Sequence, residues 1–140
     1  MRQAVLDTDI LSYLIDERYP EVVATARQYF RVFRYFTVSV VSVAEIIKGF
    51  EATQSYGRLT DFIERIGGFE LLPVGGDEGI LAGRILGSLM RTGERIGPLD
   101  PFIAATAIES RRPLVTNNIR HYQRIVDLGF SLELENWRNP

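Results

Sequence analysis

The 140-residue sequence has no cysteine and no long uncharged apolar run. Without cysteine, the chain forms neither disulfides nor zinc–thiolate sites. The apolar stretch FTVSVVSVA at 36–44 is far shorter than the roughly 18 to 20 residues that a membrane helix needs. Asp7 and Asp9 interrupt the N-terminal apolar run, so the sequence does not predict a signal peptide. We therefore expect a cytoplasmic protein that crosses no membrane.

Several catalytic motifs are also missing. The sequence has no G-x-S-x-G motif and no glycine-rich phosphate loop, which argues against a serine hydrolase or a nucleotide-binding enzyme. The single histidine, His121, is expected at the surface or at a helix end, without a catalytic role. The net charge of −2 disfavours an unspecific polyanion binder. Nearly all of the cations are arginine, a side chain that suits phosphate and carboxylate but whose abundance alone decides nothing.

Short apolar strands alternate with amphipathic helices along residues 1–140, and the length fits a single domain. The predicted strands cover 3–6, 36–40, 69–74, 113–116 and 131–136, and the predicted helices cover 9–17, 20–33, 42–52, 57–66, 75–93, 97–110 and 117–125. Repeated strand-to-helix succession with fully apolar strands predicts a mainly parallel sheet covered on both faces. The expected fold is a three-layer α/β/α sandwich.

Three acids and one amide fall near the carboxyl ends of these strands. Asp7 ends the first strand, and Glu45 lies in the first turn of the helix after the second. Asp100 opens the helix before the fourth strand, and Asn118 follows that strand. Ligands of open parallel sheets bind at this edge, so the four side chains are expected to line one site.

Helix capping is the alternative explanation for each of these residues. The expected caps are Thr8 or Asp9 for the first helix, Ser42 with Glu45 as a capping box for the third, Asp100 for the sixth and Asn118 for the last. Asp7 fits this explanation least, because it directly follows a buried strand, where an unpaired carboxylate is costly.

Convergence of the acids has an electrostatic consequence. Each close pair of carboxylates costs on the order of 4 kcal/mol at an effective dielectric constant near 20. Either the pKa values rise or a cation lies among the acids. Oxygen ligands without histidine or cysteine favour Mg²⁺, with Mn²⁺ as a substitute. Carboxylate-held Mg²⁺ typically supports phosphodiester hydrolysis by a metal-activated water.

Four segments together resemble the PIN domain, and more narrowly the VapC toxins of bacterial and archaeal toxin–antitoxin pairs. They are VLDTDILSYL at 5–14, VSVVSVAEIIKGF at 38–50, IGPLDPFIAATAI at 96–108 and LVTNNIRHYQRI at 114–125. The resemblance implies a metal-dependent endoribonuclease, often a homodimer, that a VapB-like antitoxin keeps inactive.

The resemblance also implies roles for individual residues. Asp7, Glu45 and Asp100 are the expected Mg²⁺ ligands, and Asn118 stands where many PIN domains have a fourth acid. With one negative charge fewer, the free protein is expected to hold one metal ion. The residues expected to orient these ligands are Thr8, Asp9 and Thr116.

The sequence leaves two alternatives for each group of residues that could contact the substrate or a partner. Cations on the segments that flank the proposed edge are candidates for phosphate contacts, with a solvated helix face as the alternative. They are Lys48, Arg84, Arg91, Arg95 and Arg120. The aromatic run YFRVFRYF at 29–36 either belongs to the core or forms part of a groove for the antitoxin or a dimer contact.

Two other functions fit parts of the sequence. The DTD motif at 7–9 also suits a haloacid-dehalogenase-like phosphatase, which needs a later lysine near a strand end, and Lys48 is the only lysine. The other alternative is a catalytically decayed PIN-like domain that binds RNA or serves as a scaffold.

Overall fold

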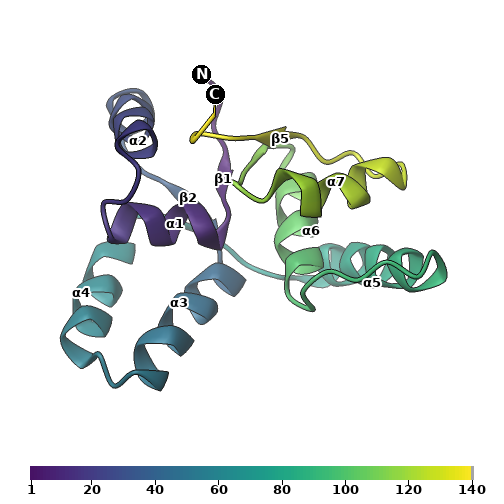
Figure 1. Cartoon of the computed structure of the whole chain (residues 1–140), viewed down its shortest axis with the longest axis horizontal. Coiled ribbons are helices and arrows are strands. Elements are labelled where there is room, and N and C mark those ends of the chain that lie inside the picture. The colour runs from purple at the N-terminus through teal and green to yellow at the C-terminus, as the bar shows by residue number, and fades with distance from the viewer. Residues whose placement is uncertain (140) are drawn as a thin grey trace.

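The computed structural model describes residues 1–139 and places short parallel strands between two groups of helices (Figure 1). The strands are β1 (Val5–Leu6), β2 (Thr37–Ser39), β3 (Glu70–Leu72), β4 (Leu114–Val115) and β5 (Leu134–Glu135). The helices are α1 (Thr8–Ile15), α2 (Pro20–Phe33), α3 (Val40–Ala52), α4 (Tyr56–Ile66), α5 (Gly76–Arg91), α6 (Asp100–Ser110) and α7 (Ile119–Asp127).

The strands form one sheet in the order β3-β2-β1-β4-β5, and every pairing is parallel. Helices α1 to α4 and helices α5 to α7 lie on different sides of the sheet in Figure 1. The predicted α/β fold with a parallel central sheet is therefore confirmed. No helix among residues 1–139 is long and apolar enough to cross a membrane.

Neighbouring residues of β1 and β4 explain why these two central strands are fully apolar. On β1, Leu6 packs into a cluster with residues of α1 to α4, whereas Val5 packs into a second cluster with residues of α5 to α7. On β4, Val115 and Leu114 divide between the same two clusters. Successive side chains of a strand point to opposite faces, so a sheet covered on both faces needs an apolar residue at each position.

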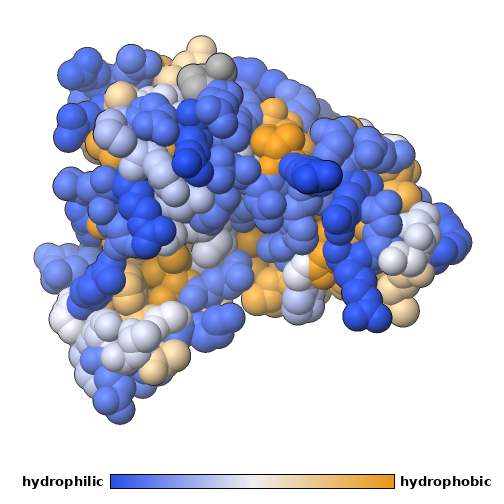
Figure 2. All heavy atoms as spheres, in the orientation of Figure 1, coloured by the Kyte–Doolittle hydropathy of each residue, from blue (hydrophilic) through white to orange (hydrophobic). Residues whose placement is uncertain are grey.

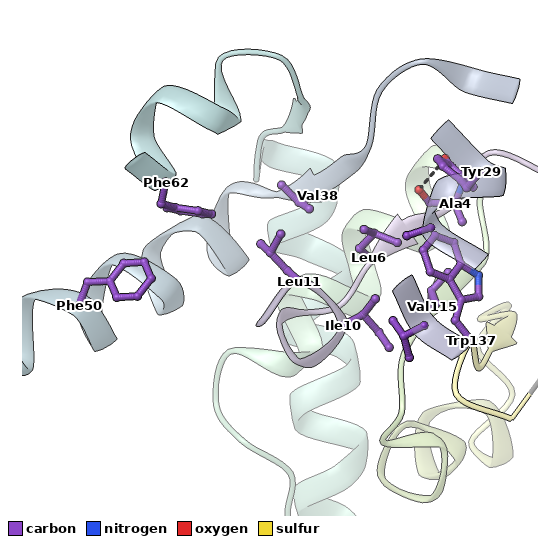
Figure 3. Close-up of a cluster of buried hydrophobic side chains, with 12 residues drawn as sticks. Ala4, Leu6, Ile10, Leu11, Tyr29, Val38, Phe50, Phe62, Val115 and Trp137 are labelled. Atoms are coloured by element: carbon purple, nitrogen blue, oxygen red, sulfur yellow. Dashed lines mark hydrogen bonds between the residues drawn. The ribbon is translucent and has the colours of Figure 1, made fainter. Parts of the chain in front are cut away.

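The first cluster contains part of the aromatic run (Figure 3). Tyr29 has no exposed surface, and its ring lies 5.4 Å from that of Trp137 and 5.7 Å from that of Phe36, between ring centroids. The Tyr29 hydroxyl accepts a hydrogen bond from the backbone N–H of Ala4 at 3.0 Å. Phe30, in contrast, is 44% exposed. The run therefore contributes both to the core and to the surface.

The start of α3 differs from the prediction. Ser39 is the N-cap, and its hydroxyl accepts a hydrogen bond from the backbone N–H of Val41 at 3.1 Å. Ser42 lies inside the helix and is fully buried, so the predicted capping box of Ser42 and Glu45 is wrong. The strand ends at a serine that can cap, and the helix begins there, three residues earlier than the Ser-x-x-Glu pattern indicates.

The strand order has a switch point at β1. β1 is central, with β2 on one side and β4 on the other, so the connections after β1 and before β4 run in opposite directions. Such a switch point is where open parallel sheets bind ligands. The face drawn in Figure 2 is mostly hydrophilic, with separate hydrophobic patches.

Candidate active site

Asp7 is the buried centre of the candidate site. It directly follows β1, and only 5% of its surface is exposed. Its Oδ1 accepts hydrogen bonds from the backbone N–H of Thr8 at 2.8 Å and from the Tyr122 hydroxyl at 3.0 Å. Its Oδ2 accepts one from the Thr116 hydroxyl at 2.8 Å. Asp7 is also the N-cap of α1, so the prediction that Thr8 or Asp9 caps this helix is wrong.

The electrostatic environment of Asp7 disfavours its charge. The pKa of Asp7 is raised to about 7, mainly by burial and also by the charges of Asp9 and Asp100, although the hydrogen bonds from Thr116 and Thr8 act in the opposite direction. None of the ion pairs within residues 1–139 includes Asp7 or Asp9. A carboxylate in this position calls for a positive charge that the described chain does not supply.

Asp9 connects α1 to the loop that follows β4. Its Oδ2 accepts a hydrogen bond from the backbone N–H of Asn117 at 3.0 Å, and its Oδ1 accepts one from Ile10 at 2.7 Å. Burial raises the pKa of Asp9, and Asp100 adds to this increase. Asp9 thus fixes the β4–α7 loop beside Asp7 and adds a second acidic group to the site.

Thr8 links Glu45 to the segment that carries Asp7. The Thr8 hydroxyl donates a hydrogen bond to Glu45 Oε1 at 2.7 Å and lies 2.9 Å from Ser42 Oγ. Glu45 therefore faces the start of α1 from α3, as the sequence predicts for a shared site.

Asp100 is placed by α6 and held by a residue of α7. It is the first residue of α6, whose N-cap is Leu99 and has no side-chain cap bond. The predicted cap role of Asp100 is therefore not observed. Its Oδ2 lies 2.6 Å from His121 Nε2, and the two side chains are only 23% and 21% exposed.

Asn118 lies at the edge of the site rather than within it. It is the N-cap of α7, with no side-chain cap bond, and it is exposed. Its backbone N–H donates to the Thr116 hydroxyl at 3.0 Å, and this contact helps to orient the Thr116 hydroxyl toward Asp7. The backbone of Asn118 thus has a defined contact with the site, whereas its amide side chain faces solvent.

Two residues of the site were given no role by the sequence. Tyr122 is 1% exposed and donates to Asp7, and the negative charges around it raise its pKa in addition to burial. His121, expected at the surface or a helix end, contacts Asp100 instead. A signal for Tyr122 was present, because it is the aromatic residue of the segment LVTNNIRHYQRI, one of the four on which the resemblance rests.

The carboxylates of Asp7, Glu45 and Asp100 suit a hard divalent cation, but they do not converge on one point. Within residues 1–139, no three histidine, cysteine, aspartate or glutamate side chains form a ready metal-binding group. Each of the three predicted ligands, however, keeps an oxygen free to bind. Glu45 Oε2 and Asp100 Oδ1 have no hydrogen-bond partner in the described chain, and Asp7 Oδ2 has one. Carboxylate oxygens of this kind fit Mg²⁺ or Mn²⁺.

The cations predicted to contact RNA are all exposed and stand on α3, α5, α7 and the segment before α6. They are Lys48, Arg84, Arg91, Arg95 and Arg120. None of the five side chains takes part in an ion pair within residues 1–139. Their positive charges are therefore available to an anionic partner.

Comparisons with known proteins identify relatives of the whole chain. The family model of the PIN domain matches residues 4–127. Ribonuclease VapC2 of Haemophilus influenzae is 30% identical over 141 residues, covering 98% of this chain and 99% of the relative. The tRNA(fMet)-specific endonuclease VapC of Shigella flexneri is 29% identical over 142 residues, with the same coverage. Among solved structures, a DNA-bound VapBC from Salmonella typhimurium superposes with a TM-score of 0.81 at 27% identity, covering 98% of this chain and 99% of that one.

Proposed function

The chain belongs to the PIN domain family, and we propose that it is a VapC-type ribonuclease toxin that hydrolyses RNA phosphodiester bonds with Mg²⁺. Similarity to ribonucleases of this name over nearly the whole length supports the activity. The single observation that carries the metal dependence is Asp7, a buried carboxylate at the carboxyl end of β1 that has acidic neighbours but no cationic partner within residues 1–139.

The acids are assigned to cation binding. Asp7, Glu45 and Asp100 would hold the ion through their free oxygens, exchanging part of their present hydrogen bonding for metal–oxygen bonds. Bound Mg²⁺ supplies Lewis-acid chemistry, because it lowers the pKa of a water and neutralises phosphate charge. An ion among these carboxylates would also counteract the effect of burial and of the neighbouring acids on the pKa of Asp7, and so favour its charged form.

The other polar residues hold the acids in place. Thr116 and Tyr122 donate to opposite oxygens of Asp7 and fix the plane of its carboxylate. Thr8 fixes Glu45, and Asp9 fixes the β4–α7 loop. Asn118 is assigned to the border of the site, where its exposed amide is available to a water or to the RNA phosphate. With an amide at this position, we expect one metal ion in the free protein.

An apolar groove supports a VapB-like antitoxin as the partner. The groove encloses about 610 Å³ between α1, α2, α4 and the start of β3. Its apolar floor includes Leu14, Phe30 and Phe69, and three arginines of its lining are exposed, namely Arg27, Arg31 and Arg65. This chemistry suits an amphipathic segment that carries acids beside its apolar side chains. The homodimer and the cytoplasmic location stay predictions.

The phosphatase alternative has little support. Its chemistry requires a lysine near the nucleophilic aspartate, but Lys48 is exposed on α3 and makes no hydrogen bond or ion pair in the described chain. The scaffold alternative leaves the unbalanced acidic cluster without a purpose, because carboxylates with perturbed pKa values typically mark functional sites. It is separated from the nuclease by the experiments below.

The proposed function is tested by expression and by cleavage in vitro. Induced wild-type protein should arrest growth, and the purified protein should cleave total RNA in Mg²⁺ or Mn²⁺ but not in EDTA. Asp100→Asn should abolish both effects, whereas Asp61→Asn, an exposed aspartate of α4, should abolish neither. Cleavage that persists in EDTA, or undiminished in Asp100→Asn, would contradict the proposal.

A further inference from the structure

Two consecutive residues of α7 hold two acids that come from different parts of the chain. His121 Nε2 lies 2.6 Å from Asp100 Oδ2, at the start of α6. The Tyr122 hydroxyl donates to Asp7 Oδ1, at the end of β1, at 3.0 Å. The first turn of α7 therefore contacts both carboxylates, and the spacing between them depends on this helix.

The His121 ring is itself fixed in place. It packs edge-on against the ring of Tyr122, with centroids 5.5 Å apart and an angle of 88° between the planes. Tyr122 is almost fully buried, so its closely packed ring restricts the orientation of the His121 ring. His121 can therefore define a direction for its partner, as a freely rotating surface side chain cannot.

Gly97 leaves room for the same Asp100 oxygen. A Cβ atom at position 97 would lie 3.0 Å from Asp100 Oδ2 and 3.5 Å from its Cγ. Asp100 Oδ2 thus lies between the His121 ring and the space that a Cβ atom at position 97 would occupy. Asp100 Oδ1 has no hydrogen-bond partner within residues 1–139 and is left free to bind a ligand.

The helix start does not explain this orientation. The N-cap of α6 is Leu99, and Asp100 makes no cap bond. The contact with His121, 21 residues later in the sequence, is the side-chain hydrogen bond that orients the carboxylate in the described chain.

We propose that His121 is a positioning residue, which fixes the rotamer of Asp100 so that Oδ1 is presented to the divalent cation. The inference rests on the proposed function, since it assigns the geometry of one ligand of that cation. His121 acts through Asp100 and contacts neither the reacting phosphate nor the ion. Residues that orient metal ligands typically change affinity or activity about 10- to 100-fold when replaced.

The test compares two replacements of His121. His121→Leu keeps most of the side-chain volume and removes the polar contact, whereas His121→Gln keeps an N–H donor. Mn²⁺ affinity is measured by calorimetry with the metal alone, and kcat and KM are measured on a labelled RNA that the wild type cleaves. Gln123→Ala, at an exposed position of the same helix, is the control.

His121→Leu should weaken Mn²⁺ binding and lower kcat, each about tenfold or more, with KM for RNA within about twofold. His121→Gln should recover most of both losses, and Gln123→Ala should lose neither. Unchanged or tighter Mn²⁺ binding in His121→Leu would overturn the positioning role, since it would show that the histidine is neutral or competes for the carboxylate. A wild-type chain without Mn²⁺ binding or cleavage would overturn the proposed function as well.

Gly97→Ala is a second, independent test, because the new methyl group presses on Asp100 Oδ2. The φ angle of Gly97 is not in the left-handed region, so alanine introduces no backbone strain. We expect Gly97→Ala to weaken Mn²⁺ binding severalfold in the wild-type background and to have a smaller effect beside His121→Leu, where Asp100 can move away. Equal effects in the two backgrounds would show that Asp100 is not held between the two residues.

Discussion

Two polar clusters lie at opposite ends of the strands of the same sheet, and they shift the pKa of a carboxylate in opposite directions. At the amino ends of the strands, Glu70 bonds to Arg112 and accepts from the Thr37 hydroxyl at 2.8 Å. The contact with Arg112 lowers the pKa of Glu70. At the carboxyl ends, Asp7 has hydrogen-bond donors but no cationic partner in the described part of the chain, and its pKa is raised to about 7.

The difference separates a structural cluster from a functional one. The Glu70 cluster is complete, because its charge is balanced within the chain. The Asp7 cluster adds Asp9 and Asp100 to a buried carboxylate and so is completed by a charge from outside. The same sheet thus has an ion pair at the amino ends of its strands and a candidate cation-binding site at their carboxyl ends.

The largest difference between the Asp7 cluster and the Glu70 cluster should be in their effect on catalysis. Asp7→Asn preserves the side-chain shape but removes the charge that holds the cation, so kcat for RNA cleavage should fall on the order of 10³-fold. Glu70→Gln, the same chemical change in the other cluster, should leave kcat within about threefold. Comparable losses in both variants, measured at saturating Mg²⁺, would remove the distinction.

The next effect should appear in the pH dependence of stability. In metal-free protein, Asp7 binds a proton up to about pH 7 when folded, but only up to about pH 4 when unfolded. Between these values the folded state binds more protons, so the free energy of unfolding should fall as pH rises from about 4 to about 7.

Urea denaturation in EDTA at several pH values measures this slope. Asp7→Asn should flatten it, because the amide does not titrate, and Asp9, whose pKa is also raised, should account for the remainder. Stability of the wild type that rises with pH over this interval would contradict the account of the acidic edge.

The smallest effect should come from breaking the ion pair between Glu70 and Arg112. Arg112→Leu leaves Glu70 without its cation, and we expect the free energy of unfolding to fall by about 1 kcal/mol. The loss is limited because the Glu70 side chain is 36% exposed and water replaces part of the interaction. The double variant with Glu70→Leu should regain part of the loss, and additive losses in urea denaturation would show that the two residues do not interact.

The sequence predicts the positions of site residues better than their contacts. Asp7 could be placed at the carboxyl end of β1 because the apolar run before it ends there, and Thr116 likewise follows β4. These positions follow from the strand pattern and from the parallel sheet. The fold of the sheet then brings the two residues together, and Thr116 donates to Asp7 at 2.8 Å.

Contacts between distant segments were not predictable in the same way. The partner of Asp100 is His121, and the partner of Asp9 is the backbone of Asn117, which depend on how α6 and α7 pack rather than on local propensity. The Ser42 capping box failed for a related reason, since Ser39 ends a strand and competes for the same helix start. Local motifs identify residues that can cap, whereas tertiary packing decides which one does.

The central claim, that the acidic edge binds a divalent cation, is tested most directly by calorimetric titration of the metal-free protein with Mn²⁺. The account predicts one bound ion in the wild type, loss of binding in Asp7→Asn and unchanged binding in Glu70→Gln. A wild-type chain that binds no Mn²⁺ at millimolar concentration, or an Asp7→Asn variant that binds it as tightly as the wild type, would contradict the claim.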